Sequence, residues 1–472
     1  MPYSYKYGEV MISGRMDSLF SSKIRKILTL ISFSLVFICI FLVRYFQDDV
    51  LSIAWLYAMY VCIMFLMVLY KNNLNKYEIA IFCFLGIQLV AVVPVPGNMP
   101  SLIGTSYLLS YRYGVSSRSF VATIIDFFTR GGFISRYFIW HFIFSSTIFL
   151  SFVTAVCLGT TIQKAKDDTK LFLIFLTLLF LSCFTAPVAY FFIGNFGRTE
   201  IFAMLILFLV MLVITKPVVR CIIPLLAVIV IAIHLIFAFF FIPFIGVLLL
   251  YEICKKTEIK KHVVFLFVAT IKTLFIVFIC YLLFARETFV FEDARSFYEY
   301  LNTRTDIIFS EMCLYMTMFA SLEDHLIYWG NTVQLGFHGH WTILINIPIV
   351  GLFVVFWIKC FLKETEKAMK LFFLLPILVL PFQAMAFFMF FDFGRWMIMV
   401  LNVQFMLFFY LAFVNNSTVL TVAQKSIPFV KRNAFFVILL YLIIAFLGPV
   451  GIIGPSERIV NIFYTARQFI GL

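Results

Sequence analysis

The residues of this sequence best suited to chemistry are single arginines placed where helices are expected to begin or end. Four of them are candidate ligands for a phosphate group or an acidic sugar: Arg112, Arg118, Arg198 and Arg395. A guanidinium group is planar and always charged, and it binds phosphate oxygens through paired hydrogen bonds. We therefore expect these side chains to meet in one anion-binding site at a membrane surface.

Two of these arginines belong to the stretch 107–136, which contains no lysine. Its middle, 116–128, predicts a short amphipathic or re-entrant helix, because Tyr-Arg-Tyr-Gly leads into it and a glycine pair follows it. Arg118, at the start of this helix, is expected to contact the anion. Arg130 and Arg136 lie near the next apolar run and are expected to anchor it.

The other two arginines each follow the dipeptide Phe-Gly at the expected start of an apolar run. Helix N-termini bind anions through free N–H groups, so Arg198 and Arg395 suit a phosphate site. Asp392 stands three residues before Arg395 and faces the same side of the helix. It is a candidate catalytic residue that orients the phosphate or acts as a base. The alternative is a salt bridge that fixes the helix end.

His234 is the second candidate catalytic residue. It lies in an apolar run, at the expected tip of a helical hairpin, and imidazole is suited to acid–base work near neutral pH. The alternative is a polar group satisfied in the core. His338 and His340 lack companion ligands at fixed spacing, and no nucleotide-binding motif is present, so we expect no metal and no cofactor.

Composition predicts an all-α fold that spans a membrane. The chain has 472 residues, of which 64% are hydrophobic and 12% charged. Continuous apolar runs of about 20 residues indicate helices and exclude a β-barrel. We expect one integral membrane domain over 1–472, with about 13 spans (12 to 14). The expected spans lie near 26–45, 51–70, 77–95, 137–159, 170–193, 200–214, 219–235, 238–253, 262–284, 341–361, 369–390, 396–414 and 433–451.

Lysines and arginines are expected to lie on opposite faces of the membrane. The first apolar run follows Lys23-Ile-Arg-Lys26, which places the N-terminus in the cytoplasm. All the basic loops rich in lysine then fall inside, while most arginines fall outside. The net charge of +13 is spread between helices and forms no continuous basic domain, so nucleic acid is not an expected partner.

Two extracytoplasmic loops follow from this topology, 96–136 and 285–340. The second mixes aromatic residues with carboxylates and amides, which suits either a sugar surface or ordinary packing at the membrane interface. It is expected to form short helices near 292–301 and 306–320.

In architecture, with many spans, two large outer loops and outward arginines, the chain resembles the Wzy-type O-antigen and capsular polysaccharide polymerases. Tyr111-Arg-Tyr-Gly, Arg118-Ser-Phe-Val-Ala-Thr123 and Asp392-Phe-Gly-Arg395 also resemble membrane proteins of bacterial surface-polysaccharide clusters. The resemblance implies a glycosyltransferase in the bacterial inner membrane that joins repeat units. Donor and acceptor would be glycans linked to undecaprenyl diphosphate, and the resemblance implies that the diphosphate is bound by Arg112, Arg118, Arg198 and Arg395. A chain-length regulator and a flippase are implied partners beside the lipid bilayer.

Three other functions remain open. A GT-C-type glycosyltransferase that uses a polyprenyl-phosphate sugar would need a catalytic carboxylate in its first outer loop, where Asp48 and Asp49 stand. A non-enzymatic transporter of lipid or polysaccharide would need a polar path, of which Lys272 is the main sign. An O-antigen ligase would differ only in its acceptor.

Overall fold

The structure, a computed structural model, describes residues 74–92, 96–99, 101–116, 118–182, 196–255, 260–284, 288–321, 323–325, 327, 338–389 and 393–439. The chain divides into two compact units, Met1–Asn73 and Leu74–Leu472, and every described residue belongs to the second. Within it all regular elements are helices, and an isolated parallel bridge joins Ile134 to Thr305. The prediction of one domain over the whole chain stays a prediction.

Six helices in the described part are long and apolar enough to cross a membrane, which agrees with a polytopic helical protein. These candidate spans are Arg136–Lys164, Phe237–Cys254, Lys261–Tyr281, Asn346–Lys363, Lys367–Phe387 and Arg395–Phe413. The expected number of about 13 spans stays a prediction. The expected spans 26–45 and 51–70, and most of 433–451, lie outside the described residues.

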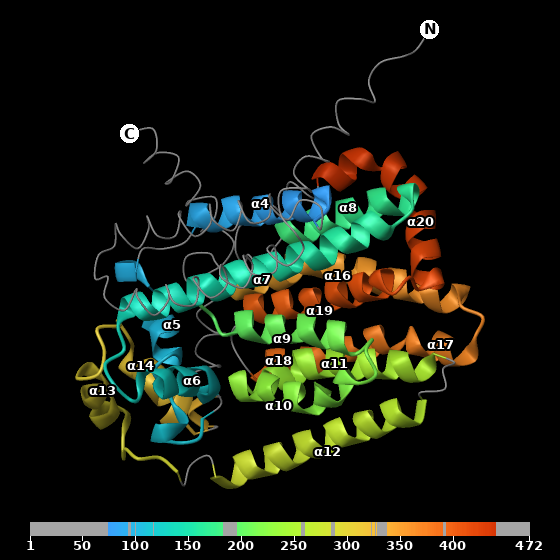
Figure 1. The fold of residues 1–472 in the computed structure, drawn as a ribbon. Helices are drawn as coiled ribbons and strands as arrows, with labels where there is room; N and C mark the ends of the chain where they lie inside the picture. Colours follow the sequence, from blue (N-terminus) through green and yellow to red (C-terminus); the bar gives the residue numbers. More distant parts are fainter. Residues whose placement is uncertain are drawn as a thin grey trace, which may run out of the picture. The chain divides into compact units, whose positions relative to one another are not determined.

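The described part of the chain consists of longer helices, which form a bundle, and of shorter helical elements (Figure 1). The longer helices are α4 (Lys76–Val92), α6 (Ser119–Thr129), α7 (Arg136–Lys164), α8 (Asp167–Ser182), α9 (Glu200–Val213), α10 (Ile223–Ile233), α11 (Phe237–Cys254), α12 (Lys260–Phe284), α13 (Ala294–Asn302), α16 (His338–Lys363), α18 (Leu375–Met389), α19 (Phe393–Phe413) and α20 (Ser417–Arg432). The shorter elements are η2 (Pro96–Asn98), α5 (Ser101–Ser106), η3 (Tyr111–Tyr113), η5 (Val219–Ile222), α14 (Glu311–Leu314), the π-helical turn η6 (Tyr315–Phe319) and α17 (Lys367–Phe372).

The helical hairpin expected around His234 is present. His234 has an extended backbone, with φ −162° and ψ 123°, and ends α10, while α11 begins at Phe237. Pro243 lies inside α11. One expected span, 369–390, forms two consecutive helices, α17 and α18. Helix α20 was not expected, because its lysines suggested a loop; the Asn416 side chain caps its start.

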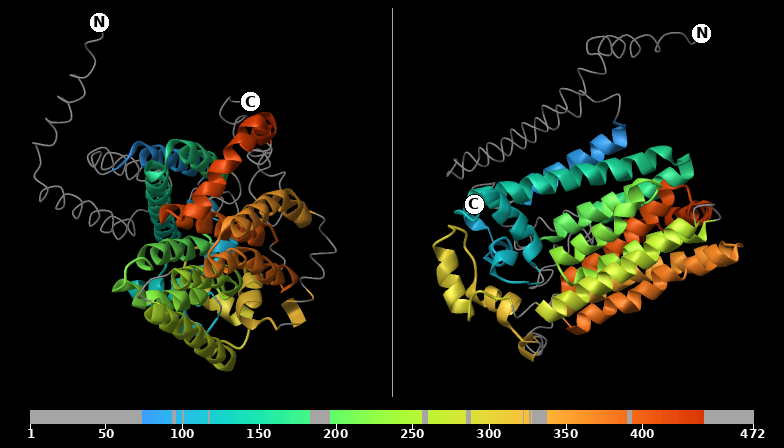
Figure 2. Two further views of the ribbon diagram at one scale, coloured as in Figure 1. Left: turned by 90° about the vertical axis from the view of Figure 1, so that its right-hand side faces the viewer. Right: turned by 60° about the horizontal axis from the view of Figure 1, so that its bottom comes forward.

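Helix α19 forms the core of the bundle, since 94% of its apolar 18-residue stretch is buried. It packs against α7, α11, α16, α18 and α20, and α9 lies on α7 and α10. Helix α12 packs on α10 and α11 at the edge of the bundle, and only 17% of its apolar 18-residue stretch is buried. An apolar helix that is mostly exposed in a membrane protein faces lipid. Helix α12 therefore marks part of the lipid-facing surface (Figure 2).

The bundle has two ends that differ in their basic residues. At the arginine end, α9 and α19 begin with Arg198 and Arg395 close to their first turns. At the lysine end, Lys164 lies over the Phe413 ring, and Lys255 binds Glu252 at 2.7 Å. This separation agrees with the expected segregation of the two residue types. Which end faces the cytoplasm stays a prediction.

The two expected outer loops pack together at the arginine end as one layer, which we call the cap (Figure 1). Its described residues are 96–99, 101–116, 118–135 and 288–321. Ile134 N donates to the Arg304 carbonyl at 2.9 Å, and Val290 N donates to the Tyr113 carbonyl at 3.1 Å. The helix expected at 116–128 is confirmed as α6. Those expected near 292–301 and 306–320 correspond to α13 and to α14 with η6.

Candidate functional site

Three of the four predicted arginines gather around His234 at the arginine end. Arg118 is the N-cap residue of α6, Arg198 precedes α9, and Arg395 lies in the first turn of α19. His234 lies in the turn between α10 and α11 and is buried. Burial, and then the charges of Arg118, Arg395 and Arg198 in that order, hold the pKa of His234 well below its ordinary value. Four separate parts of the chain thus come together, so that the charges of three arginines act on His234.

Arg395 is held by a carboxylate from another helix. Its Nε lies 2.9 Å from Glu200 Oε1, and the two side chains are only 4% and 1% exposed. The Arg395 guanidinium also lies over the Trp396 ring, 4.2 Å from its centroid. Trp396 in turn stacks on Phe240 at 5.7 Å. These contacts hold the buried guanidinium in one orientation.

Arg198 is positioned by a backbone that favours glycine. Gly197 has φ +88°, and a Cβ there would lie 2.6 Å from Ile143 Cδ1 and 2.7 Å from Ile103 Cγ2. Only glycine accommodates this conformation and this close packing without strain. The Tyr107 hydroxyl donates a hydrogen bond to the Gly197 carbonyl. The Phe-Gly-Arg turn therefore carries the buried Arg198 side chain into the site.

The tautomer of the neutral His234 imidazole is set by its surroundings. Its Nδ1 accepts a hydrogen bond from Ile236 N at 3.3 Å, so the ring proton lies on Nε2. Nε2 is buried and has no hydrogen-bond partner among the described residues. This arrangement favours a hydrogen-bond donor over the general base that the sequence suggested. The catalytic role of His234 stays a prediction.

Arg118 is brought to the site because the cap is fixed on α10. The Tyr111 hydroxyl donates to the Ala232 carbonyl at 3.4 Å, two residues before His234. Tyr111 N donates to Thr123 Oγ1 at 2.8 Å, which ties α6 to the same place. Arg118 also acts on His325, which belongs to the second expected outer loop and follows the described residues of the cap, because the charge of Arg118, after burial, lowers the pKa of His325. Residues of both expected outer loops thus lie near the site.

Arg112 lies apart from the other three arginines. Its guanidinium lies against Gly131, just beyond the C-terminal end of α6, and Arg304 Nη2 would lie 3.6 Å from a Cβ at Gly131. Arg118 is at the opposite end of this helix of 11 residues, about 16 Å along its axis. The prediction that all four arginines bind one diphosphate therefore does not fit the positions of Arg112 and Arg118.

Several other arginines of the cap have structural partners. Arg136 Nε lies 3.7 Å from Asp306 Oδ2, and Arg136 N donates to the same carboxylate at 2.7 Å. Arg304 Nη1 donates to the Tyr300 hydroxyl at 2.8 Å. Arg130 ends α6 in the left-handed conformation, with φ 52°, and its side chain is exposed. Anchoring of the next helix by Arg136 agrees with its ion pair to the second half of the cap.

Some predicted residues cannot be placed. Asp392, Asp48 and Asp49 lie outside the described residues. The described part of the chain contains no group of three or more His, Cys, Asp or Glu side chains that could hold a metal ion. The Arg395–Glu200 pair shows that a salt bridge does fix the start of α19, although its carboxylate comes from α9.

Sequence reasoning missed two residues of the site, Glu200 and His325. A carboxylate two residues after Arg198, at the start of an apolar helix, was a usable signal, because charged groups near membrane depth mark functional or paired sites. His325 carried no such signal. It lies in the helical segment 323–325, far from Arg118 in the sequence, and only the fold brings the two residues close enough for the charge of Arg118 to act on it.

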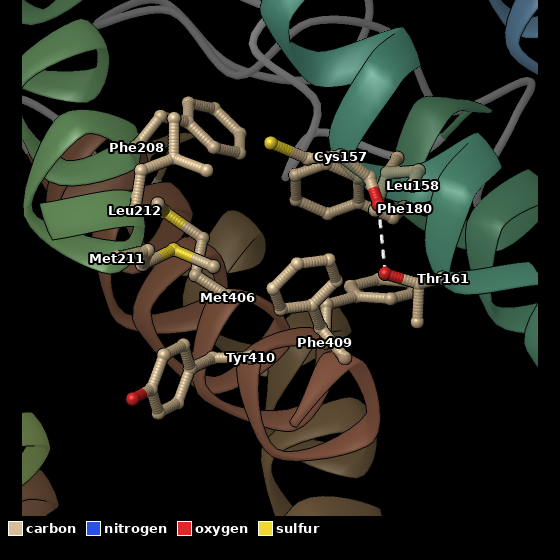
Figure 3. Close-up of a pocket in the computed structure, with 11 residues that line it drawn as sticks. Cys157, Leu158, Thr161, Phe180, Phe208, Met211, Leu212, Met406, Phe409 and Tyr410 are labelled. Carbon is tan, nitrogen blue, oxygen red and sulfur yellow. Dashed lines mark hydrogen bonds between the residues drawn. The ribbon is translucent and has the colours of Figure 1, made fainter. Parts of the chain in front are cut away.

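A small apolar cavity lies away from this site, toward the lysine end (Figure 3). It lies between α7, α8, α9 and α19, and hydrocarbon, sulfur and aromatic groups dominate its lining. The Tyr410 hydroxyl donates to Glu252 at 3.0 Å and points out of the cavity. The Thr161 hydroxyl donates to the Cys157 carbonyl within α7. The cavity therefore offers no charged group for chemistry.

A comparison of this chain with protein-family models, with curated proteins and with solved structures finds no match. The functional argument therefore depends on the site itself.

Proposed function

We propose that this chain polymerises lipid-linked oligosaccharide repeat units at the extracytoplasmic face of a bacterial inner membrane. The observation that supports this proposal is the meeting of Arg118, Arg198 and Arg395 around one buried histidine. Arginine binds two phosphate oxygens at once, and a buried arginine is positioned before the ligand arrives. In the proposed orientation the N-terminus is cytoplasmic, and the product is O-antigen or capsule.

In the proposed reaction, a hydroxyl of the acceptor unit attacks the anomeric carbon of the donor glycan. The carbon–oxygen bond to the diphosphate breaks, and undecaprenyl diphosphate leaves with the bonding electrons. Negative charge grows on the leaving diphosphate, and fixed guanidinium groups in a site of low dielectric stabilise it. The donor ester is already activated, so the reaction requires no ATP.

Each residue has a definite part in this proposal. The three arginines bind the diphosphate, and His234 Nε2–H donates a further hydrogen bond to one of its oxygens. Asp392 remains the candidate base that accepts the proton of the attacking hydroxyl. Glu200 holds Arg395 in place and is a positioning residue.

The test replaces the guanidinium group of arginine by the ammonium group of lysine, which keeps the positive charge. Arg198→Lys and Arg395→Lys, alone and together, are introduced into the source bacterium in place of the native gene, and surface glycan is separated by length. We expect short glycans carrying single units and a loss of long chains, because lysine cannot make paired contacts. Protein amounts are compared through an epitope tag.

A matched control is Arg295→Lys in the cap. Arg295 is an exposed arginine whose side chain is 64% accessible and which pairs with Glu299 at 2.7 Å. This variant should retain the native chain lengths. A native distribution from the double variant Arg198→Lys/Arg395→Lys would refute the diphosphate assignment. Loss of all transferred glycan, single units included, would instead indicate a ligase.

A further inference from the structure

Helix α6 presents an apolar stripe on the face that points away from the protein. Phe127 and Phe128 are 77% and 57% exposed, and Ile124 is 37% exposed. With the half-buried Phe120 they follow the spacing i, i+4, i+7 and i+8, which places them on one side of a helix. The opposite side packs inward, with Val121, Ala122 and Ile125 at most 3% exposed. The helix therefore has two apolar faces: the described residues bury one, and the other stays largely exposed.

The position of α6 shows what lies beside this stripe. The helix packs on α10, and the segment before it is tied to the end of α12, because Val115 N donates to Thr288 Oγ1 at 2.9 Å. Toward that end α12 exposes Phe275 and Leu283, 64% and 59% accessible. The start of α6 thus lies close to the end of α12, a helix whose apolar side chains are largely exposed.

Exposed cations lie at one end of the same helix. Arg130 is the C-cap residue of α6, and Arg112 lies against the next residue, Gly131; both side chains are exposed. A helix with exposed aromatic residues and neighbouring arginines suits the boundary between lipid headgroups and acyl chains. In water, such a patch would leave apolar area uncovered. The charges identify phospholipid as the partner, since their guanidinium groups match lipid phosphates.

We propose that α6 lies in the membrane interface at the arginine end of the bundle. The stripe Phe120, Ile124, Phe127 and Phe128 enters the acyl region of the adjacent leaflet. Arg112 and Arg130 bind phospholipid phosphates at the headgroup level, separately from the site around His234. This surface contact is independent of the proposed reaction and can hold for any activity of the chain.

The test is photo-crosslinking of the full-length chain in vesicles of phosphatidylethanolamine and phosphatidylglycerol. Phe127→p-benzoylphenylalanine changes little in size or polarity and captures neighbouring C–H bonds on irradiation. The mass of the intact protein then reports a phospholipid adduct. Phe275→p-benzoylphenylalanine on α12 is the positive control, because its side chain faces lipid in any orientation of the cap.

The matched negative control is Asn302→p-benzoylphenylalanine, at an exposed position of α13 in the other half of the cap. We expect phospholipid adducts at position 127 in a yield similar to that at position 275, and several-fold above that at position 302. A yield at position 127 no greater than at position 302, with normal adducts at position 275, would overturn the proposal. Crosslinks between two copies of the chain would overturn it as well, in favour of a protein interface.

Discussion

Arg395 Nε lies 2.9 Å from Glu200 Oε1, and this ion pair joins the starts of two helices, α19 and α9, that are far apart in the sequence. Both side chains are almost completely buried. A buried charge requires its partner, because removing one member leaves the other in a medium that solvates it poorly. The pair therefore sets both the orientation of Arg395 and the junction of the two helices.

Removal of the Glu200 charge should destabilise the protein strongly. We expect Glu200→Gln to cost about 3–5 kcal/mol, because it breaks a buried ion pair with Arg395. Thermal unfolding in detergent, followed by fluorescence, measures the effect. The control Glu299→Gln removes an exposed partner of Arg295 and should leave the midpoint almost unchanged.

The double variant Glu200→Gln/Arg395→Gln separates charge balance from simple packing. Its loss of stability should be smaller than the sum of the two single losses, since neither charge is then left alone. Additive losses would contradict the coupling of the two side chains.

Gly197 should be intolerant of any side chain. Its φ is +88°, and a Cβ there would lie 2.6 Å from Ile143 Cδ1. Gly197→Ala is therefore expected to cost about 1–2 kcal/mol from the backbone alone. It should also move Arg198 and shorten the surface glycan under the proposed function. Gly351→Ala is the control: a Cβ there meets nothing within 4 Å, so helix propensity should make this change neutral or slightly stabilising. Equal midpoints for both variants would contradict the argument.

Local patterns predicted the elements that depend on nearby residues. The hairpin at His234 followed from lysines on both sides of one long apolar run, and α6 followed from the turn residues around 116–128. The gathering of arginines at one end followed from their separation from lysine. The turn residues lie close together in the sequence, and the distribution of lysine reflects how the helices are oriented in the membrane. Both signals can therefore be recognised in the sequence alone.

Contacts across the fold could not be predicted in the same way. The contact of Arg395 with Glu200 on another helix was not predicted, and the expected pairing of Arg395 with Asp392, which lies outside the described residues, stays a prediction. The separation of Arg112 from Arg118 depends on how the chain passes around α6. Helix α20 was missed because its polar face, which lies outside the apolar core, was taken for a loop.

Stability should fall as the pH drops, in part because of His234. In the unfolded chain its imidazole takes up a proton below its ordinary pKa of about 6.5. In the fold, burial and then Arg118, Arg395 and Arg198 keep the pKa well below that value, so the unfolded state binds more protons there. The contribution of His234 is complete above about pH 6.5 and is lost toward lower pH, at up to about 1.4 kcal/mol per pH unit.

The variant His234→Gln isolates this contribution. The unfolding free energy of this variant, measured between about pH 5 and pH 8, should decrease less toward acid pH than that of the native chain. The difference in slope should correspond to the uptake of up to one proton on unfolding. His262→Gln, at an exposed position on α12, is the control for removal of a histidine. An unchanged slope in His234→Gln would show that His234 is protonated to the same extent in both states.

Two buried glutamines should respond in opposite directions to replacement by methionine. Gln383 is fully buried in α18, and neither its Oε1 nor its Nε2 has a hydrogen-bond partner among the described residues. Gln404 is equally buried in α19, but its Oε1 accepts from Trp357 Nε1 at 2.7 Å and its Nε2 donates to the Pro376 carbonyl at 3.1 Å.

An unsatisfied buried amide costs about 1–3 kcal/mol, and methionine has a similar length without that cost. Gln383→Met should therefore raise the thermal midpoint in detergent. Gln404→Met should lower it, because the Trp357 N–H and the Pro376 carbonyl lose their partners. A lower midpoint for Gln383→Met would mean that its amide binds a group essential to the fold, such as an internal water, and would place a polar site in the middle of the bundle.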